Sequence, residues 1–306
     1  MHLDEPRWSG RHQFDTRLLP VEKLLYQSDL AVAGLWRCPP DAPWFRDSGP
    51  ARNNLFVFPR SVVRIRRKNG GSFVSDAAIV TLYNRGDEYT REAISSRGDH
   101  ADWFSVEPGV LAEATSGFGT RAGGGVRPFS LTYVWSSAHA CLVQRRLVAR
   151  LINSPGITPL EVDETVLHLL ASLFPARRYS ISWVAERHVR LTERARELVA
   201  SRYAEPLLLS NLAQACQVSP WFLARVFRRV TGTTIHQYQR QLRLRASLER
   251  VLEGEDLTRV ALDLGFSSHS HFTESFRRAF GTPPTGLRRS ASADCRAGLP
   301  RRTRIR

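Results

Sequence analysis

The C-terminal part of the chain contains two copies of a sequence pattern that predicts a short helix, a turn and a second helix. The copies span residues 210–232 and 258–281. Their separation is 48 residues at Ala213 and 49 from Ser219 onward, so the second turn is one residue longer. In each copy a Ser precedes the second helix as an N-cap, and a Gly marks its end. The repeat therefore predicts two copies of one small helical unit, which a helix at 235–253 would join rigidly.

The second helix of each copy is amphipathic. One face is apolar, formed by Leu223, Val226, Phe227 and Val230 in the first copy and by Phe272, Phe276 and Phe280 in the second. A polar, arginine-bearing helix held out by a helical scaffold fits the DNA major groove. The candidate DNA-contacting residues are Trp221, Ala224, Arg225, Arg228 and Arg229 in the first copy and His269, Ser270, His271, Glu274, Arg277 and Arg278 in the second.

About a hundred residues resemble the AraC/XylS family of transcriptional regulators. The resemblance lies in SPxxLxRxFRR at 219–229, GFSSxSHF at 265–272 and FRRAFG at 276–281. It implies a double helix-turn-helix domain that binds double-stranded DNA, regulates bacterial transcription and contacts RNA polymerase. It also implies a cupin-like N-terminal domain for effector sensing or for forming a homodimer, and it places Trp221 and Arg225 at positions that contact bases.

The sequence departs locally from the family pattern. Pro283 stands where a capping hydroxyl is usual and Leu287 where an aromatic is usual, which weakens the prediction of an ordered last helix. Glu274 stands where Arg is common, so the second helix is expected to read different bases.

The positive charge is concentrated in the same region. Residues 191–306 carry 20 Arg, no Lys and 10 acidic residues, a net charge of +10, whereas residues 1–190 carry 24 basic and 19 acidic residues, a net charge of +5. This placement is typical of a domain that binds a polyanion.

The N-terminal half has a different pattern. Short apolar alternations separated by turn signals such as 69–71 and 84–87 predict an antiparallel β-sandwich or barrel. We therefore expect an α+β fold, with a cupin-like sensor or dimerisation domain at 20–155, a linker helix region at 156–190, the DNA-binding domain at 191–289 and a disordered basic tail at 290–306. Candidate members of an effector pocket are Trp36, Tyr83, Arg85 and Trp103.

Other classes of function have little in the sequence to favour them. His269 and His271 diverge on a helix and no further ligands lie near them, so neither a metal site nor a cofactor is expected. The sequence contains no motif of a catalytic nucleophile, so no catalysis is expected. An enzyme tethered to DNA would need a reactive cysteine cluster, which Cys38 does not provide. The four scattered cysteines fit a reducing cytoplasm, and the absence of an h-region or a long apolar run predicts no membrane segment. An alternative to the effector-sensing domain is that the N-terminal half is purely a dimerisation or partner-binding module with no small ligand.

Overall fold

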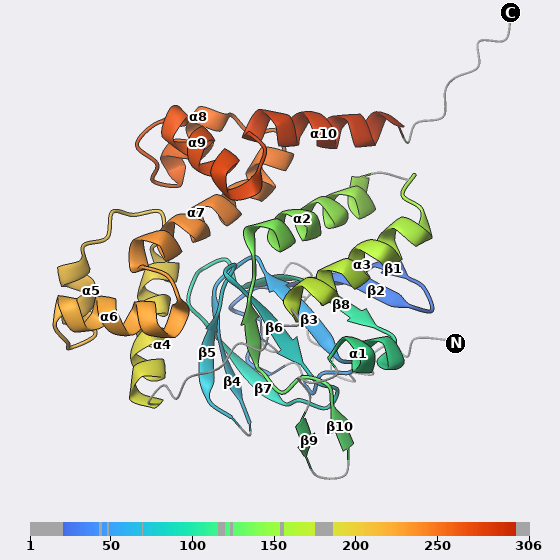
Figure 1. Ribbon diagram of the computed structural model, residues 1–306, viewed down its shortest axis with the longest axis horizontal. Helices are drawn as coiled ribbons and strands as arrows, with labels where there is room; N and C mark the ends of the chain where they lie inside the picture. Colours follow the sequence, from blue (N-terminus) through green and yellow to red (C-terminus); the bar gives the residue numbers. More distant parts are fainter. Residues whose placement is uncertain are drawn as a thin grey trace, which may run out of the picture.

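The computed structural model describes residues 21–42, 45–47, 49–68, 70–115, 120–122, 125–153, 156–174 and 186–297. The fold combines a strand-rich N-terminal part with a helical C-terminal part, as the α+β prediction required (Figure 1). Residues 1–20 and the end of the expected tail, 298–306, lie outside the described residues.

The N-terminal strands form two main antiparallel sheets. The large sheet has the order β1–β2–β8–β3–β6–β11, with bounds Val21–Gln27, Ala31–Cys38, Asp99–Val106, Leu55–Pro59, Ile79–Tyr83 and Tyr133–Trp135. The small sheet has the order β5–β4–β7, with bounds Ser72–Ser75, Val63–Arg67 and Tyr89–Ala93. A short helix α1 (Pro108–Ala114) and a hairpin of β9 (Thr120–Ala122) and β10 (Gly125–Arg127) complete this part.

Strand parity divides the large sheet into two faces. One face carries Ala33, Phe56 and Phe104, which are buried in a cluster with residues of α3. The other face meets the small sheet, where Tyr83 packs against Tyr89 with ring centroids 4.6 Å apart and ring planes tilted by 40°. Among the described strands the two sheets are separate ladders, so closure into the expected cupin-like barrel stays a prediction.

Two amphipathic helices follow the strands. Helix α2 (Ala138–Asn153) lies between the large sheet and the C-terminal helices (Figure 1). Helix α3 (Pro159–Leu173) begins at Thr158, whose side chain accepts from the Glu161 N–H at 3.3 Å. Its apolar face belongs to the core of the large sheet, although the segment lies within the expected linker region.

The C-terminal part consists of helices among the described residues. Their bounds are Glu186–Ser201 (α4), Leu209–Ala215 (α5), Pro220–Thr231 (α6), Ile235–Leu252 (α7), Leu257–Asp263 (α8), His269–Phe280 (α9) and Pro284–Ala297 (α10). Thr234 and Gln237 form the capping box that opens α7. The long helix α7 lies between the first helix-turn-helix unit (α5 and α6) and the second unit (α8 and α9), as expected (Figure 1).

The last helix forms despite its departures from the family pattern. Leu287 is only 1% exposed and packs in the core of the second unit, so an aliphatic side chain fills the place of the usual aromatic. The helix extends to Ala297, so part of the segment expected to be a disordered tail from residue 290 is helical.

Candidate nucleic-acid interface

The second helix of each unit begins and ends as the sequence predicted. The Ser219 hydroxyl accepts from the Phe222 N–H at 3.2 Å, and the Ser268 hydroxyl accepts from the His271 N–H at 3.1 Å. Both helices end at a left-handed glycine, Gly232 or Gly281, each with φ near +74°. These caps fix where each helix starts and stops, and therefore which side chains it presents.

Helix α6 presents its predicted residues beside a groove. Trp221 is 67% exposed, and the Arg225 guanidinium carbon lies 4.8 Å from the centroid of its ring, a cation–π contact between neighbours one helical turn apart. Arg228 and Arg229 are exposed, and Ala224 is half-buried. A groove of about 510 Å³ between α5, α6 and the start of α7 is lined by Trp221, Ala224, Arg225 and Arg228 among others.

Helix α9 presents its predicted residues with a different internal arrangement. Glu274 bridges its own neighbours, with one oxygen 3.0 Å from Arg277 Nη2 and the other 3.2 Å from Arg278 Nη2. The hydrogen bond from Arg277, followed by the charges of both arginines, lowers the pKa of the exposed Glu274 carboxyl. Its ionised form therefore holds both guanidinium groups at neutral pH.

The histidines of α9 are also exposed, together with Ser270. His271 Nδ1 lies 3.0 Å from the Ser267 hydroxyl, and its ring stands edge-on to Phe266 with centroids 5.6 Å apart. His271 therefore supports the turn of the second unit from outside, while His269 and Ser270 project at the start of the helix.

The second helices of the two units, α6 and α9, differ in charge at equivalent positions. Residue 274 is the counterpart of residue 225, because the copies are 49 residues apart there. The face of α6 carries Arg225, Arg228 and Arg229, whereas on α9 a carboxylate replaces the first of these arginines. The exposed face of α6 is thus the more positive of the two.

Two scaffold residues were not identified from the sequence. Arg243 of α7 donates to the carbonyls of Tyr203 at 2.6 Å and Gly265 at 2.5 Å, and Gln239 donates to the carbonyl of Tyr203 at 3.0 Å. Arg243 thereby ties the end of α4 to the turn of the second unit. Polar residues on a long helix have the same sequence pattern as a solvated face, so no sequence signal marked this role.

The candidate effector residues are only partly brought together. Trp36, Tyr83 and Trp103 lie on the same face of the large sheet, because Gly34 pairs with Trp103 and residues 55–57 align Trp103 with Tyr83. Arg85 lies apart, exposed beyond the end of β6.

The space between the sheets also holds Arg91, which the sequence did not single out. This side chain is 2% exposed, its guanidinium carbon lies 4.8 Å from the Trp36 ring, and its Nη1 donates to Asp99 at 2.6 Å. The Nε and Nη2 of Arg91 and the Nε1 of Trp36 and Trp103 are buried, with no hydrogen-bond partner among the described residues.

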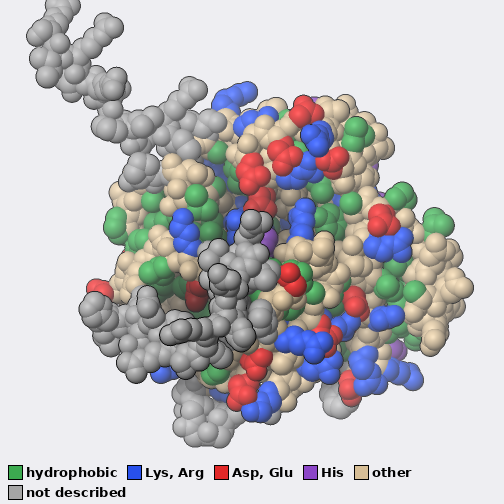
Figure 2. All heavy atoms as spheres, turned by 180° about the vertical axis from the view of Figure 1, so that it is seen from behind, with side chains coloured by type: hydrophobic (Ala, Val, Ile, Leu, Met, Phe, Trp, Pro, Cys, Tyr) green, Lys and Arg blue, Asp and Glu red, His purple; other side chains and the backbone are tan. Residues whose placement is uncertain are grey.

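The face opposite to the view of Figure 1 carries Lys and Arg side chains interspersed with Asp and Glu (Figure 2). The positive excess is therefore not gathered into one block on that side. Within the described part of the chain, no group of three or more His, Cys, Asp or Glu side chains could hold a metal ion. None of the described helices has both the length and the apolar character needed to cross a bilayer.

Two capped, exposed helices on one compact helical scaffold define a helix-turn-helix DNA-binding protein. Comparison with known proteins agrees: the model of a helix-turn-helix domain matches residues 212–290. Regulatory protein SoxS of Salmonella typhimurium is 32% identical over 102 residues, which cover 33% of this chain and 95% of SoxS. The right origin-binding protein of Escherichia coli is 37% identical over 87 residues, which cover 28% of this chain and 30% of that protein.

Solved structures of ToxT align with most of the chain. ToxT from Vibrio cholerae shares 12% identity over 87% of this chain and 99% of its own, with a TM-score of 0.33.

The chain belongs to the AraC/XylS family of transcriptional regulators, and it is a DNA-binding regulator of transcription.

Proposed function

We propose that α6 and α9 enter successive major grooves, about 34 Å apart on one side of the duplex, and read an asymmetric promoter site. The observation that carries the proposal is that both helices bury their apolar faces and leave their polar faces exposed. Bacterial promoters lie in the cytoplasm, where the proposal places the protein, and regulation there includes contact with RNA polymerase.

In this proposal α6 contributes more to base recognition than α9 does. Arg225 pairs with the O6 and N7 of a guanine, and the Trp221 ring stacked on its guanidinium limits the orientations it samples. Ala224 contacts a thymine methyl, and Arg228 and Arg229 meet phosphates. Helix α6 is thus the main reader.

Helix α9 contributes less and depends more on context. His269 and Ser270 reach base edges, while His271 supports the turn. Glu274 keeps Arg277 and Arg278 on its own carboxylate, so each phosphate contact that they make requires the arginine to leave an existing ion pair.

Substitution of Arg225 by Ala tests the assignment of the main reader. Loss of one bidentate base contact should weaken specific binding by about 1–3 kcal/mol and relax preference at one base position. The matched control is Arg66→Ala, which removes an exposed arginine of the N-terminal part that pairs with Glu92. The measurement is fluorescence anisotropy on an operator selected from a random library and on a scrambled duplex. Equal losses on both duplexes would mean that Arg225 meets phosphate, and the assignment would be withdrawn.

We further propose that residues 20–155 form a cupin-like sensor, joined through 156–190 to the DNA-binding domain at 191–289. The effector site lies between the sheets, lined by Trp36, Tyr83 and Trp103. Four buried nitrogen donors there, on Arg91, Trp36 and Trp103, have no partner among the described residues. Because an unpaired buried donor is costly, the proposed effector carries oxygen acceptors, such as a carboxylate or a carbonyl.

A thermal-shift screen of the full chain tests this second proposal. Acceptor-bearing metabolites should raise the unfolding temperature of the wild type and not that of Arg91→Met, with Arg66→Met as control. If no compound shifts the wild type and sedimentation shows a stable homodimer, the N-terminal part is better explained as a dimerisation or partner-binding module.

A further inference from the structure

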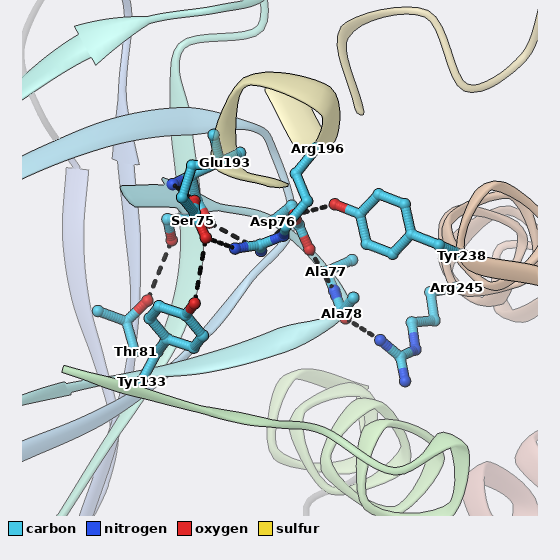
Figure 3. A network of polar contacts seen from close by, with 11 residues as sticks. Ser75, Asp76, Ala77, Ala78, Thr81, Tyr133, Glu193, Arg196, Tyr238 and Arg245 are labelled. Carbon is cyan, nitrogen blue, oxygen red and sulfur yellow. Dashed lines mark hydrogen bonds and ion pairs between the residues drawn. The ribbon is translucent and has the colours of Figure 1, made fainter. Parts of the chain in front are cut away.

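A fully buried arginine joins the DNA-binding helices to the N-terminal sheets. Arg196 of α4 is 0% exposed, and its Nη2 donates to Asp76 at 2.7 Å and to the Val74 carbonyl at 2.9 Å (Figure 3). Its Nη1 donates to Glu193 at 2.8 Å. Asp76, in the turn between β5 and β6, is also fully buried. An ion pair without solvent access therefore crosses between two parts of the molecule that are 120 residues apart in sequence.

Two tyrosines extend this contact to further elements. Tyr238 of α7 donates its hydroxyl to the Asp76 carboxylate that Arg196 also contacts, and Tyr133 of β11 donates to Glu193 at 3.1 Å. Glu193 also accepts from the Val74 N–H at 2.8 Å. Figure 3 shows these side chains converging from strands on one side and helices on the other. We call Asp76, Tyr133, Glu193, Arg196 and Tyr238 the interdomain network.

Arg196 keeps its positive charge within the interdomain network. Burial lowers the pKa of Arg196. The negative charges of Asp76 and Glu193 raise it by more than burial lowers it, so the net shift is upward. Burial and the charge of Asp76 raise the pKa of Tyr238, so its hydroxyl stays a donor. A buried arginine whose carboxylate is removed would be left with an uncompensated charge.

Apolar packing surrounds the interdomain network and reaches both helix-turn-helix units. Val74 and Ala78 of the N-terminal part share a buried cluster with residues of α4, α5, α6 and α7. Leu142 of α2 shares another with α7, α8, α9 and α10. Arg245 of α7 donates to the Ala77 carbonyl in the β5–β6 turn at 2.8 Å and to the Ser136 carbonyl, between β11 and α2, at 2.5 Å. The N-terminal part thus holds the first unit through the β5–β6 turn and the second through α2.

These contacts leave the DNA-facing surface free. The exposed residues of α6 and α9 take no part in the interdomain network, whose helical members within the described residues belong to α4 and α7. The N-terminal part therefore fixes the scaffold of the reading helices without covering them.

We propose that Asp76 is a positioning residue for DNA binding: through Arg196 and Tyr238 it fixes α4 and α7, and so sets the spacing and angle at which α6 and α9 meet the duplex. The segment from β11 to α2 then links the large sheet to α4, to α7 and to the second unit. This inference depends on DNA binding by the two units, but not on which side chains read the bases.

The test compares operators of different internal spacing, using the full chain. The variants are Tyr238→Phe and Asp76→Asn. Their matched controls are Tyr26→Phe and Asp163→Asn, which remove a tyrosine–carboxylate hydrogen bond of 2.9 Å inside the N-terminal part. The probes are an operator selected from a random library by the wild type and derivatives with one or two base pairs inserted between the two recognised segments.

The wild type and both controls should lose about tenfold in affinity on the respaced duplexes, equivalent to one specific contact. Tyr238→Phe and Asp76→Asn should lose at most about threefold, because the units can then adjust. A general loss of stability would weaken binding to every duplex alike and leave the spacing preference intact. If Tyr238→Phe, which removes only a hydroxyl and needs no refolding of the core, keeps the wild-type spacing preference, the proposal is wrong. That result would leave the base-reading assignments of α6 untouched.

Discussion

Replacing Glu274 by Gln should change how DNA binding responds to salt. In the structure this carboxylate holds Arg277 and Arg278 at 3.0 and 3.2 Å. Gln is nearly isosteric but uncharged, so both arginines become available for phosphate, and the repulsion between the carboxylate and the DNA backbone is removed. The reading face of α9 would then approach the charge of α6, where Arg225 occupies the equivalent position.

The size of the effect follows from counterion release. Each additional phosphate contact steepens the slope of log affinity against log salt by about 0.9. Over a fourfold rise in salt, the advantage of Glu274→Gln over the wild type should shrink about 3.5-fold for one gained contact and about 12-fold for two. The gain should appear on the operator and on a scrambled duplex, because phosphate contacts carry no sequence information.

The assay is fluorescence anisotropy on both duplexes from about 50 to 200 mM salt, the range over which such slopes are well determined. Glu205→Gln is the matched control, since it removes an exposed carboxylate paired with Arg202 in the same part of the chain but away from the reading helices. If Glu274→Gln leaves the slope unchanged, or changes it no more than Glu205→Gln does, then Glu274 does not hold the arginines back from DNA. A gain confined to the operator would instead mean that residue 274 meets a base.

Two further predictions concern the turns and the pH dependence of stability. Gly265→Ala should lower the melting temperature by several degrees, because a Cβ at φ +77° costs about 1–2 kcal/mol and would also lie 2.1 Å from the Ala204 carbonyl oxygen. Gln217→Gly, at the same turn position of the first unit with φ +57°, should instead be neutral or stabilising by up to about 1 kcal/mol, and a lower melting temperature for it would contradict the strain argument. Burial raises the pKa of Cys38 from 9.0 to about 11, and burial beside Asp76 raises that of Tyr238, so the unfolded chain releases these protons first. Stability should therefore hold up to about pH 9 and fall toward pH 11, and denaturant titrations that give a constant free energy of unfolding across this window would rule the linkage out.

The sequence predicted the helix-turn-helix units well because their signals are local. The caps at Ser219 and Ser268 and the glycines that end each helix act within one or two turns of chain, and apolar spacing alone identifies the buried face. The last helix was harder to predict, since Leu287 packs through partners that a local pattern does not reveal.

Features that depend on distant partners were not predictable in the same way. Arg196 lies in a charged segment of α4 that has the pattern of a solvated helix, and its burial depends on Asp76 far away in the chain. Arg91 is similar, because its neighbour Trp36 comes from a different sheet. Strand parity placed Trp36 and Trp103 on one face only once the register between β2 and β8 was known.

The apolar cluster that the β5–β6 turn shares with α4 to α7 also limits how the DNA-binding helices can be fused to another sensor domain. A hybrid that fused residues 186–297 to an unrelated sensor would lose Val62 and Val74 from the apolar cluster that also contains Ala195 and Val199. It would also separate Arg196 from its carboxylate on the strand side. A working graft would have to transplant the β5–β6 turn together with the helices, so the unit of exchange is larger than the segment that touches DNA.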